Sequence, residues 1–502
     1  MRSIPATMAT QHPDNATAPY WDEAGRPFIS VHQEIVEAVK CFQDLDVDEY
    51  MWDWEGKHAD AAVIDRLFSD YHEYFSKTQL GRDKFLTFRI PNIWEEKGYN
   101  LLQAMSVILS SEDFARDLKF KNRPLFEVIL PMTERSDQIM HMHKLFKRLA
   151  KFKSSEFTAD EMPNTEHLEL IPLVESVESQ INVGNLLNEY ISTYQAEYGN
   201  KPEYIRAFLA CSDSALSSGF LAGLLGNKVA LARLYEFSQA SGIPVYPIMG
   251  CGSLRFRGGL SPATVDRFLE EFPGVRTVTL QSAFRYDYPL KDVKTAINKL
   301  ESKLPKLRPL KISQQDQAEL IAITEDAAKY YKQTLSQIAS DMQPIFKMIP
   351  KRRDRRQHIG LLAYSRKMGG QSMPRAITFT AGFYSVGIPP EFIGLGRTLK
   401  GLDAANTKLL KMHYPNLIND IEAAGRFLNK ENLNKFAAGN PGWQAVKTDV
   451  EQIEEVLNIS LGPDTADQKS HLSLSKELTN TDDSKLGTEL ITKMAIIRKS
   501  LG

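Results

Sequence analysis

The chain has 502 residues, of which 42% are hydrophobic and 25% are charged, a length and composition typical of globular proteins with a large buried core. The formal net charge of -2 excludes the global basic field that nucleic-acid binding or attachment to an anionic membrane uses. The three cysteines, Cys41, Cys211 and Cys251, form no CxxC pair, which argues against a disulfide framework and a structural zinc site. The N-terminus has no apolar signal region and no stretch approaches the ~18 apolar residues of a membrane span, so we expect a cytoplasmic protein.

Short apolar runs rich in β-forming residues alternate with amphipathic helical stretches. The candidate strands, in chain order, are an element near residues 50–54, FLTFRI (85–90), LFEVIL (125–130), LELIPL (168–173), IRAFLA (205–210), VYPIMG (245–250), VRTVTL (275–280) and AITFTA (376–381). Fully apolar strands separated by helices are typical of a parallel sheet covered on both faces. About eight repeats favour a closed barrel, although an open doubly wound sheet stays possible. We therefore predict an α/β fold, a TIM-type (β/α)8 barrel with large additional α-helical segments.

Two segments break the alternation of strands and helices. Residues 310–349 have the pattern of one long helix, and the chain after about residue 401 is helical in pattern throughout. We predict a catalytic barrel over residues 1–400, with inserted helices at about 310–349, and a C-terminal helical addition over residues 401–502 that packs on the barrel. The polar, weakly periodic stretch 463–483 is interpreted as a mobile surface loop.

Polar side chains follow the candidate strands, and a parallel barrel has its reaction site at these strand ends. These residues are Arg89, Glu175, Asp213, Arg257, Gln281, Arg285 and Arg375. Because arginine binds phosphate and carboxylate groups through two parallel hydrogen bonds, the pattern predicts a polyanionic ligand. Carboxylates such as Glu175 and Asp213 suit Mg²⁺ or Mn²⁺ better than zinc. No glycine motif of a nucleotide or dinucleotide site occurs, so we expect no organic cofactor.

Five motifs occur along the chain in a consistent order. They are TQHPDN (10–15), CSDSALSSG (211–219), GSLRFRGG (252–259), QSAFRYD (281–287) and SRKMGG with PRAITF (365–379). Together they resemble the phosphoenolpyruvate carboxylase family, in its short archaeal-type branch. The match runs from Thr7 to about Gly396. One departure from the long-form pattern is Leu216, which stands where the long form has a lysine.

The resemblance implies a role for each candidate residue. The catalytic residues are expected to be His12, Arg257, Arg366 and Arg375. The metal ligands are expected to be Glu175 and Asp213, with Mg²⁺ or Mn²⁺ as the cofactor. The substrate-binding residues are expected to be Arg89, Gln281 and Arg285.

The resemblance also implies an activity and its partners. The expected substrates are phosphoenolpyruvate and bicarbonate, and the expected products are oxaloacetate and inorganic phosphate, formed via carboxyphosphate and a metal-bound enolate. His12 would act as the general base, because the pKa of imidazole lies near working pH. We expect a homotetramer that binds neither nucleic acid nor membranes.

Each motif also has a purely structural interpretation. His12 could cap the turn before Pro13, and a carboxylate such as Asp213 could lie in a first helical turn for the sake of the helix dipole. The basic run KRRDRR (351–356) is interpreted as a solvated face or a subunit contact, and HMH (141–143) as a surface pair. The acidic and basic residues of MWDWEGK (51–57) stay unassigned.

Two other functions fit part of the pattern. A metal-dependent barrel lyase that makes or breaks a carbon–carbon bond in 2-oxo acids without phosphate needs fewer arginines. A non-enzymatic oligomer that binds an anion without turnover does not need His12 beside two carboxylates. Both alternatives stay open at the level of the sequence.

Overall fold

The computed structural model describes residues 3–157, 165–354, 366–368 and 371–502. Its strands are β1 (Thr7–Thr10), β2 (Glu49–Asp53), β3 (Phe85–Arg89), β4 (Glu127–Leu130), β5 (Glu169–Val174), β6 (Ile205–Ala210), β7 (Val245–Gly250), β8 (Thr277–Leu280), β9 (Arg366–Met368) and β10 (Gln371–Met373). Strands β1 to β8 pair in chain order, each parallel to its neighbours, and β8 closes on β1. This closed barrel confirms the predicted fold class.

One or more helices follow every strand of the barrel. The later helices follow one another with no further barrel strand between them. The barrel helices are α1 (Gln33–Gln43), α2 (Val63–Asp70), α3 (His72–Lys77), α4 (Tyr99–Asp117), α5 (Ser136–Glu156), α6 (Val177–Ile181), α7 (Val183–Tyr198), α8 (Cys211–Ser218), α9 (Phe220–Ser241), α10 (Val265–Glu271), α11 (Ser282–Tyr286) and α12 (Leu290–Lys303). The additional helices are α13 (Gln314–Met348), α14 (Ala376–Ser385), α15 (Leu395–Gly401), α16 (Ala404–His413), α17 (Leu417–Gly425), α18 (Lys430–Ala437), α19 (Pro441–Leu457), α20 (Ala466–Leu478) and α21 (Ser484–Arg498).

One predicted strand is wrong. The run AITFTA (376–381) lies in helix α14, and the first strand of the barrel is instead β1, which the sequence pattern did not reveal. Helix α14 is apolar because it packs between α13 and α21, and a short apolar run does not distinguish a buried helix from a buried strand. Strand β1 has only four residues, too few for a periodic pattern to emerge.

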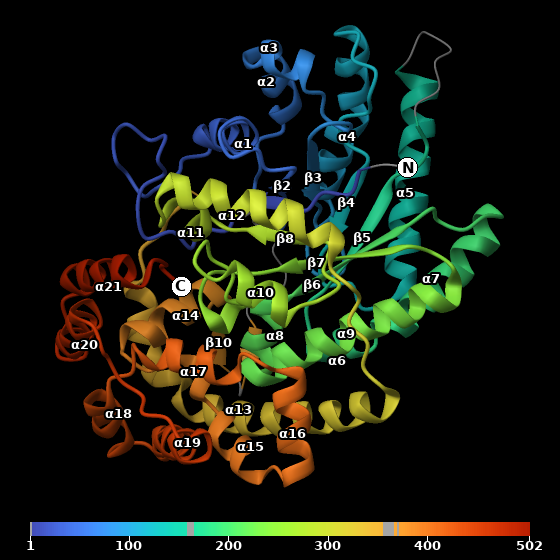
Figure 1. Ribbon diagram of the computed structural model, residues 1–502. Coiled ribbons are helices and arrows are strands. Elements are labelled where there is room, and N and C mark those ends of the chain that lie inside the picture. The colour runs from blue at the N-terminus through green and yellow to red at the C-terminus, as the bar shows by residue number, and fades with distance from the viewer. Residues whose placement is uncertain (1–2, 158–164, 355–365, 369–370) are drawn as a thin grey trace.

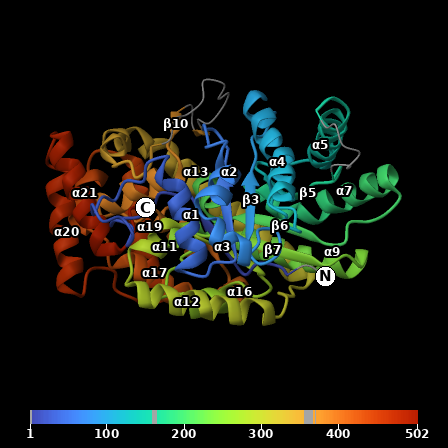
Figure 2. The ribbon, with the colours of Figure 1, turned by 90° about the horizontal axis from the view of Figure 1, so that it is seen from above.

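The long helix predicted at about 310–349 is confirmed as α13. It packs against α8 and α9 of the barrel and against α14, α15, α19 and α21. The helices from α13 onward gather on one side of the barrel, and a view from above has α20 and α21 at one edge and α5 and α7 at the opposite edge (Figures 1 and 2). The domain boundary near residue 400 stays a prediction.

The loop predicted at 463–483 is wrong, because most of this stretch forms helix α20. Thr465 and Gln468 form a capping box, in which each side chain accepts a backbone N–H from the other residue. The helix buries His471, Ser475 and Leu478, three positions that are too few and too polar to give a strong apolar period.

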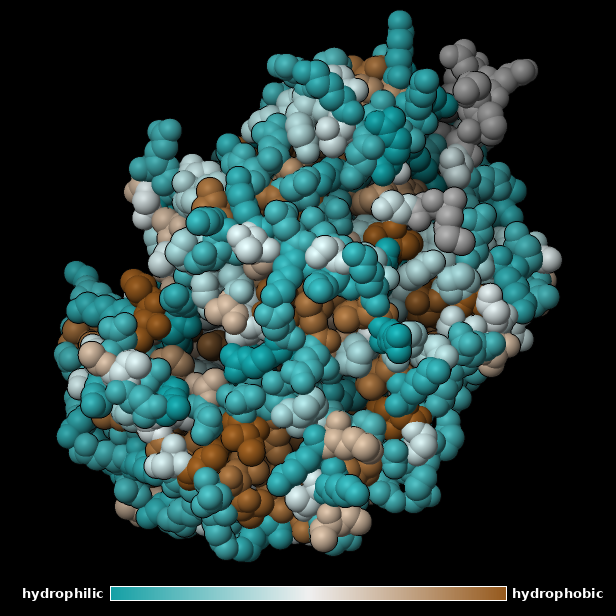
Figure 3. Space-filling view, in the orientation of Figure 1, coloured by the Kyte–Doolittle hydropathy of each residue, from teal (hydrophilic) through white to brown (hydrophobic). Residues whose placement is uncertain are grey.

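The surface is mostly hydrophilic in the view of Figure 3, with hydrophobic residues gathered over the helices of the C-terminal region. Exposed large apolar side chains there include Met412 of α16 and Ile418 of α17. Among the described residues, no helix combines the length and the apolarity that crossing a membrane requires. The homotetramer stays a prediction.

The end of the barrel that holds the first residues of the strands contains a buried ion network. The Arg206 guanidinium on β6 donates to Glu49 on β2 at 2.7 and 2.9 Å and to Glu127 on β4 at 2.8 Å. All three side chains are at most 2% exposed, and an apolar layer that includes Met51 and Ile171 packs in the barrel interior. Because a buried charge without a partner is costly, this network depends on all of its members.

We expect the substitution Arg206→Leu to lower the free energy of unfolding by about 3–5 kcal/mol, because it leaves Glu49 and Glu127 buried without their cation. Urea-induced unfolding followed by circular dichroism measures the loss. As a control, Lys77→Met breaks an exposed ion pair with Glu73 and should change stability by less than about 0.5 kcal/mol. Equal effects of the two substitutions would contradict the role of the network.

A second buried carboxylate supports the loop that follows β7. Glu391 is fully buried and accepts hydrogen bonds from the Phe256 backbone N–H at 2.8 Å and from the Tyr384 hydroxyl at 2.6 Å. Burial raises the pKa of Glu391 to about 7. The folded protein therefore keeps this proton at pH values where the unfolded chain has released it.

We expect the free energy of unfolding to fall as pH rises through the window from about 4.5 to 7, because deprotonation is easier in the unfolded chain than at buried Glu391. In a Glu391→Gln variant this fall, measured by urea unfolding between pH 5 and pH 8, should be smaller by up to about 3 kcal/mol. The variant Glu73→Gln, at an exposed position, is the control and should keep the wild-type pH dependence. A wild-type pH dependence in Glu391→Gln would exclude Glu391 as the titrating group.

Candidate active site

A cavity of about 670 Å³ lies at the carboxyl ends of the barrel strands. Strands β3, β6 and β7 contribute their last residues to its wall, and residues that follow β1, β2, β5 and β8 line the same side. The end of α13 and the start of α14 form the other side. Of the nine residues expected to form the site, seven line the cavity: His12, Arg89, Glu175, Asp213, Arg257, Gln281 and Arg375.

The cavity wall is strongly cationic. Its described lining residues carry eight cationic side chains, Lys57, Arg89, Arg257, Lys347, Lys351, Arg352, Arg353 and Arg375, and three carboxylates, Glu55, Glu175 and Asp213. This local excess of positive charge contrasts with the net charge of -2 of the whole chain. A wall of this kind favours a ligand with several negative charges.

Arg257 is a firmly held lining cation. It is 1% exposed, and its guanidinium donates to Asp14 at 3.1 Å, to Ser212 at 3.1 Å and to Gln281. Burial lowers the pKa of Arg257, and the Asp14 carboxylate opposes this effect. The side chain is therefore held in one orientation before any ligand arrives.

The glycines around Arg257 shape its loop. A Cβ on Gly252 would lie 2.8 Å from Cζ of Arg257, and Gly258 has a φ of +105°, so neither position accepts a side chain without strain. The N–H groups of Gly252 and Gly258 donate to carbonyls within the same loop, at 2.6 and 3.0 Å. The absence of a side chain at Gly252 therefore allows the Arg257 guanidinium to lie close to the backbone.

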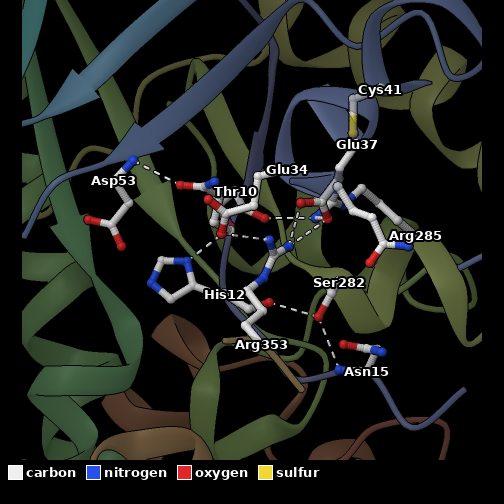
Figure 4. A network of polar contacts seen from close by, with 12 residues as sticks. Thr10, His12, Asn15, Glu34, Glu37, Cys41, Asp53, Ser282, Arg285 and Arg353 are labelled. Atoms are coloured by element: carbon white, nitrogen blue, oxygen red, sulfur yellow. Dashed lines mark hydrogen bonds and ion pairs between the residues drawn. The ribbon is translucent and has the colours of Figure 1, made fainter. Parts of the chain in front are cut away.

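His12 stands on a short segment fastened between β1 and α11. Its Nδ1 lies 2.9 Å from the Thr10 hydroxyl, and its backbone carbonyl accepts the Ser282 hydroxyl at 2.7 Å (Figure 4). Asp14 accepts the Ala283 backbone N–H at 2.7 Å and pairs with Arg257. The half-buried imidazole is therefore a wall of the cavity, and the interpretation of His12 as a mere turn cap is not supported by this position.

Asp53, at the end of β2, organises two cations of the cavity wall. Arg89 donates to both of its carboxylate oxygens, at 2.8 and 2.7 Å, and the Lys57 ammonium lies 2.6 Å from the same group. A further ion pair joins Arg89 to Glu55 at 2.8 Å. The unassigned residues of MWDWEGK thus belong to the candidate site.

Glu175 and Asp213 follow neighbouring strands of the barrel. Glu175 comes directly after β5, and Asp213 lies in the first turn of α8, which begins where β6 ends. Both side chains are half-buried and line the cavity. The N-cap of α6 is Ser176, which accepts the Ser179 backbone N–H at 3.0 Å, so Glu175 does not serve as that cap.

Two expected site residues are not seen in the cavity wall. Arg285 is fully buried behind it and donates to Glu37 at 3.1 Å and to the Thr10 carbonyl at 2.7 Å. The side chain of Arg366 lies outside the described part of the structure. Arg255, a neighbour of Arg257, pairs with Asp420 of α17 at 3.0 Å and faces away from the cavity.

The prediction of a solvated face is wrong for Arg352 and Arg353 of the basic run KRRDRR, whereas Lys351 and Asp354 are exposed and the subunit contact stays a prediction. Lys351, Arg352 and Arg353 line the cavity, and the two arginines are 6% and 3% exposed. Residues 355–356 lie outside the described residues. The sequence pattern did not place this run in the site, because its position there depends on how α13 ends against the barrel.

The surface position predicted for HMH (141–143) is wrong for His143. This imidazole is 2% exposed, and its Nε2 lies 3.0 Å from the Tyr190 hydroxyl of α7. Burial lowers the pKa of His143 to about 3. His143 is a neutral core residue, far along the chain from the candidate site and outside the cavity lining.

Comparison with known proteins agrees with the geometry. A family model described as phosphoenolpyruvate carboxylase matches residues 4–502. A phosphoenolpyruvate carboxylase of Leuconostoc mesenteroides is 52% identical, over 100% of this chain and 99% of its own. Archaeal proteins of the same name are also similar: one from Metallosphaera sedula is 36% identical over the full length of both chains, and one from Pyrococcus horikoshii is 38% identical over 85% of this chain and 89% of its own. The chain belongs to the phosphoenolpyruvate carboxylase family.

Proposed function

We propose that this protein joins bicarbonate to phosphoenolpyruvate and releases oxaloacetate and inorganic phosphate. The observation that carries the proposal is the cavity in which His12 and the Glu175–Asp213 pair face a predominantly cationic wall. Phosphoenolpyruvate presents a phosphoryl group and a carboxylate, which match a site with several arginines. The two alternative functions need fewer cations or no general base, so they use less of this site.

A divalent cation fits the carboxylate pair. Among the described residues, no three His, Cys, Asp or Glu side chains gather as a candidate metal-binding group. Glu175 and Asp213, which both line the cavity, are the residues that would hold the ion. Two carboxylates suit Mg²⁺ or Mn²⁺, which keep water and substrate oxygens in their other coordination positions. When bound, the ion would supply Lewis-acid stabilisation of negative charge on the substrate oxygens.

The first step assigned to this site is attack of a bicarbonate oxygen on phosphorus. The phosphorus–enol oxygen bond breaks, and carboxyphosphate and the enolate of pyruvate form. Arg89, Arg257 and Arg375 would hold the phosphoryl and carboxylate oxygens, whose charge redistributes during the step. Because Asp14 and Asp53 hold Arg257 and Arg89 in advance, little reorganisation is needed.

The second step is proton removal by His12. Because Nδ1 of His12 contacts the Thr10 hydroxyl, Nε2 is the nitrogen that would take the proton from carboxyphosphate. The resulting anion breaks into carbon dioxide and phosphate, and the enolate carbon attacks the carbon dioxide to give oxaloacetate. The wall around this space must exclude water, since protonation of the enolate would give pyruvate instead.

The proposal is tested by incubating the purified protein with phosphoenolpyruvate, bicarbonate and Mg²⁺. Oxaloacetate is followed by its reduction with malate dehydrogenase and NADH, and phosphate is measured in parallel. We expect equal amounts of oxaloacetate and phosphate, both dependent on bicarbonate and both abolished by chelation of the metal. The absence of both products would overturn the proposal.

We expect His12→Asn to lower the rate of oxaloacetate formation by about 10²–10⁴-fold, because the general base is lost. Bicarbonate-dependent phosphate release should persist, because the first step does not use the imidazole and the carboxyphosphate that it forms hydrolyses to bicarbonate and phosphate, while the enolate is protonated to pyruvate. The control is His141→Asn, at a half-exposed position on α5 outside the cavity lining. Proportional loss of both products in His12→Asn would contradict the assignment of His12 to the second step.

We expect Asp53→Asn to raise the KM for phosphoenolpyruvate about tenfold or more, because Arg89 and Lys57 lose the carboxylate that orients them. Steady-state kinetics at saturating bicarbonate measures the change. Asp83→Asn removes the partner of Arg82 at the surface and should leave the KM unchanged. If Asp53→Asn left the KM at the wild-type value, Arg89 would not be a substrate-binding residue.

A further inference from the structure

Helix α1 carries a fully buried carboxylate that none of the steps above uses. Glu37 accepts hydrogen bonds from Arg353 at 2.5 and 2.6 Å, from Arg285 at 3.1 Å, from the Tyr286 hydroxyl at 2.6 Å and from the Tyr50 hydroxyl at 2.9 Å. Although burial alone would raise its pKa, Arg353 and Arg285 lower the pKa of Glu37 to about 2. The carboxylate is therefore ionised throughout the working pH range.

One branch of these contacts leads from Glu37 to His12. Arg285 donates to Glu37 and also to the carbonyl of Thr10 at 2.7 Å, at the end of β1. The hydroxyl of the same Thr10 lies 2.9 Å from Nδ1 of His12 (Figure 4). The contacts of Glu37 therefore reach the residue that fixes the imidazole.

The other branch leads from Glu37 to the segment 350–353. Arg353 pairs with Glu37 through one nitrogen and with Glu34 at 3.3 Å through another. The segment is also joined to the N-terminal region, because the Ile29 N–H donates to the Arg352 carbonyl at 2.9 Å and the Arg352 side chain donates to the Asn15 carbonyl at 2.9 Å. Residues 350–353 all line the cavity.

We propose that Glu37 is a positioning residue at the centre of one buried ion cluster. Through Arg285 it fixes His12, and through Arg353 it fixes the cationic segment 350–353. The inference rests on the proposed carboxylation, in which His12 acts in the second step and the cationic wall binds the substrate. A neutral side chain at position 37 would leave Arg285 and Arg353 close together without their shared anion. His12 and the segment 350–353 would then both shift, although only residue 37 has been changed.

The two branches predict separable effects. A displaced His12 allows the first step but fails in the second. Carboxyphosphate then hydrolyses to bicarbonate and phosphate and the enolate is protonated to pyruvate, so the ratio of oxaloacetate to phosphate falls below one. A displaced segment 350–353 weakens the cationic wall, so the KM for phosphoenolpyruvate rises. A residue that merely stabilises the fold would lower the amount of active protein, which reduces both products in proportion and leaves the KM unchanged.

The central test compares Glu37→Gln with Glu34→Gln in the full-length protein. Glutamine keeps the size of glutamate and removes its charge. Glu34 is the matched control, because it lies on the same helix and contacts Arg353 but is not bonded to Arg285. For Glu37→Gln we expect a fall in the product ratio and a rise in KM of about tenfold or more, whereas Glu34→Gln should keep a ratio of one, because its contact with Arg353 does not lead to Thr10 and His12.

Two further variants test the positioning role of Glu37 if Glu37→Gln does not fold. Thr10→Val removes the hydroxyl beside His12 while keeping the side-chain shape, and it should lower the product ratio with little change in KM. Arg353→Lys keeps the positive charge but loses the paired hydrogen bonds to Glu37, and it should raise the KM with a ratio near one.

The outcomes separate the two levels of inference. An inactive wild-type protein would overturn the proposed carboxylation itself. An active wild type with a ratio of one and a normal KM in Glu37→Gln would overturn the role of Glu37 alone. A normal product ratio in Thr10→Val or a normal KM in Arg353→Lys would also overturn the role of Glu37, because Glu37 is proposed to hold both branches.

Discussion

Four buried arginines in and behind the wall of the candidate site depend on carboxylates that hold them. Asp14 stands behind Arg257, Asp53 stands behind Arg89, and Glu37 stands between Arg285 and Arg353. Removing a guanidinium from water costs several kcal/mol, and these ion pairs offset that cost for the four arginines. The pairs also fix the planes of the guanidinium groups, which decides where a phosphoryl or carboxylate oxygen can be held.

This arrangement explains which parts of the site the sequence could reveal. Residues such as His12, Glu175 and Asp213 stand in motifs or directly after strong apolar strands, so their place at the strand ends follows from a parallel barrel. The supporting carboxylates had weaker signals. Asp14 lies in the same motif as His12, whereas Glu37 lies on an amphipathic helix where a charged residue usually faces solvent.

Most of the fold was predictable because its elements carry a clear apolar pattern, and the one mistaken strand lies where that pattern is absent. Seven apolar runs at regular spacing are enough to indicate the barrel, and the long helix α13 has a clear helical period. The strand β1 is short and wholly buried and the helix α14 is short and mostly buried, so their patterns carry no clear period. Arg285 was grouped with the substrate-binding residues because it follows β8, but a turn of α11 directs it to Glu37.

The backbone also brings the two ends of the described chain together at the site. The N–H of Leu501 donates to the carbonyl of Asp14 at 2.7 Å, and Leu501 lines the cavity with His12 and Arg257. During synthesis on the ribosome, the segment with His12 emerges long before Leu501, so this contact forms only after the helices α13 to α21 have been made. The barrel strands alone therefore do not complete the cavity wall.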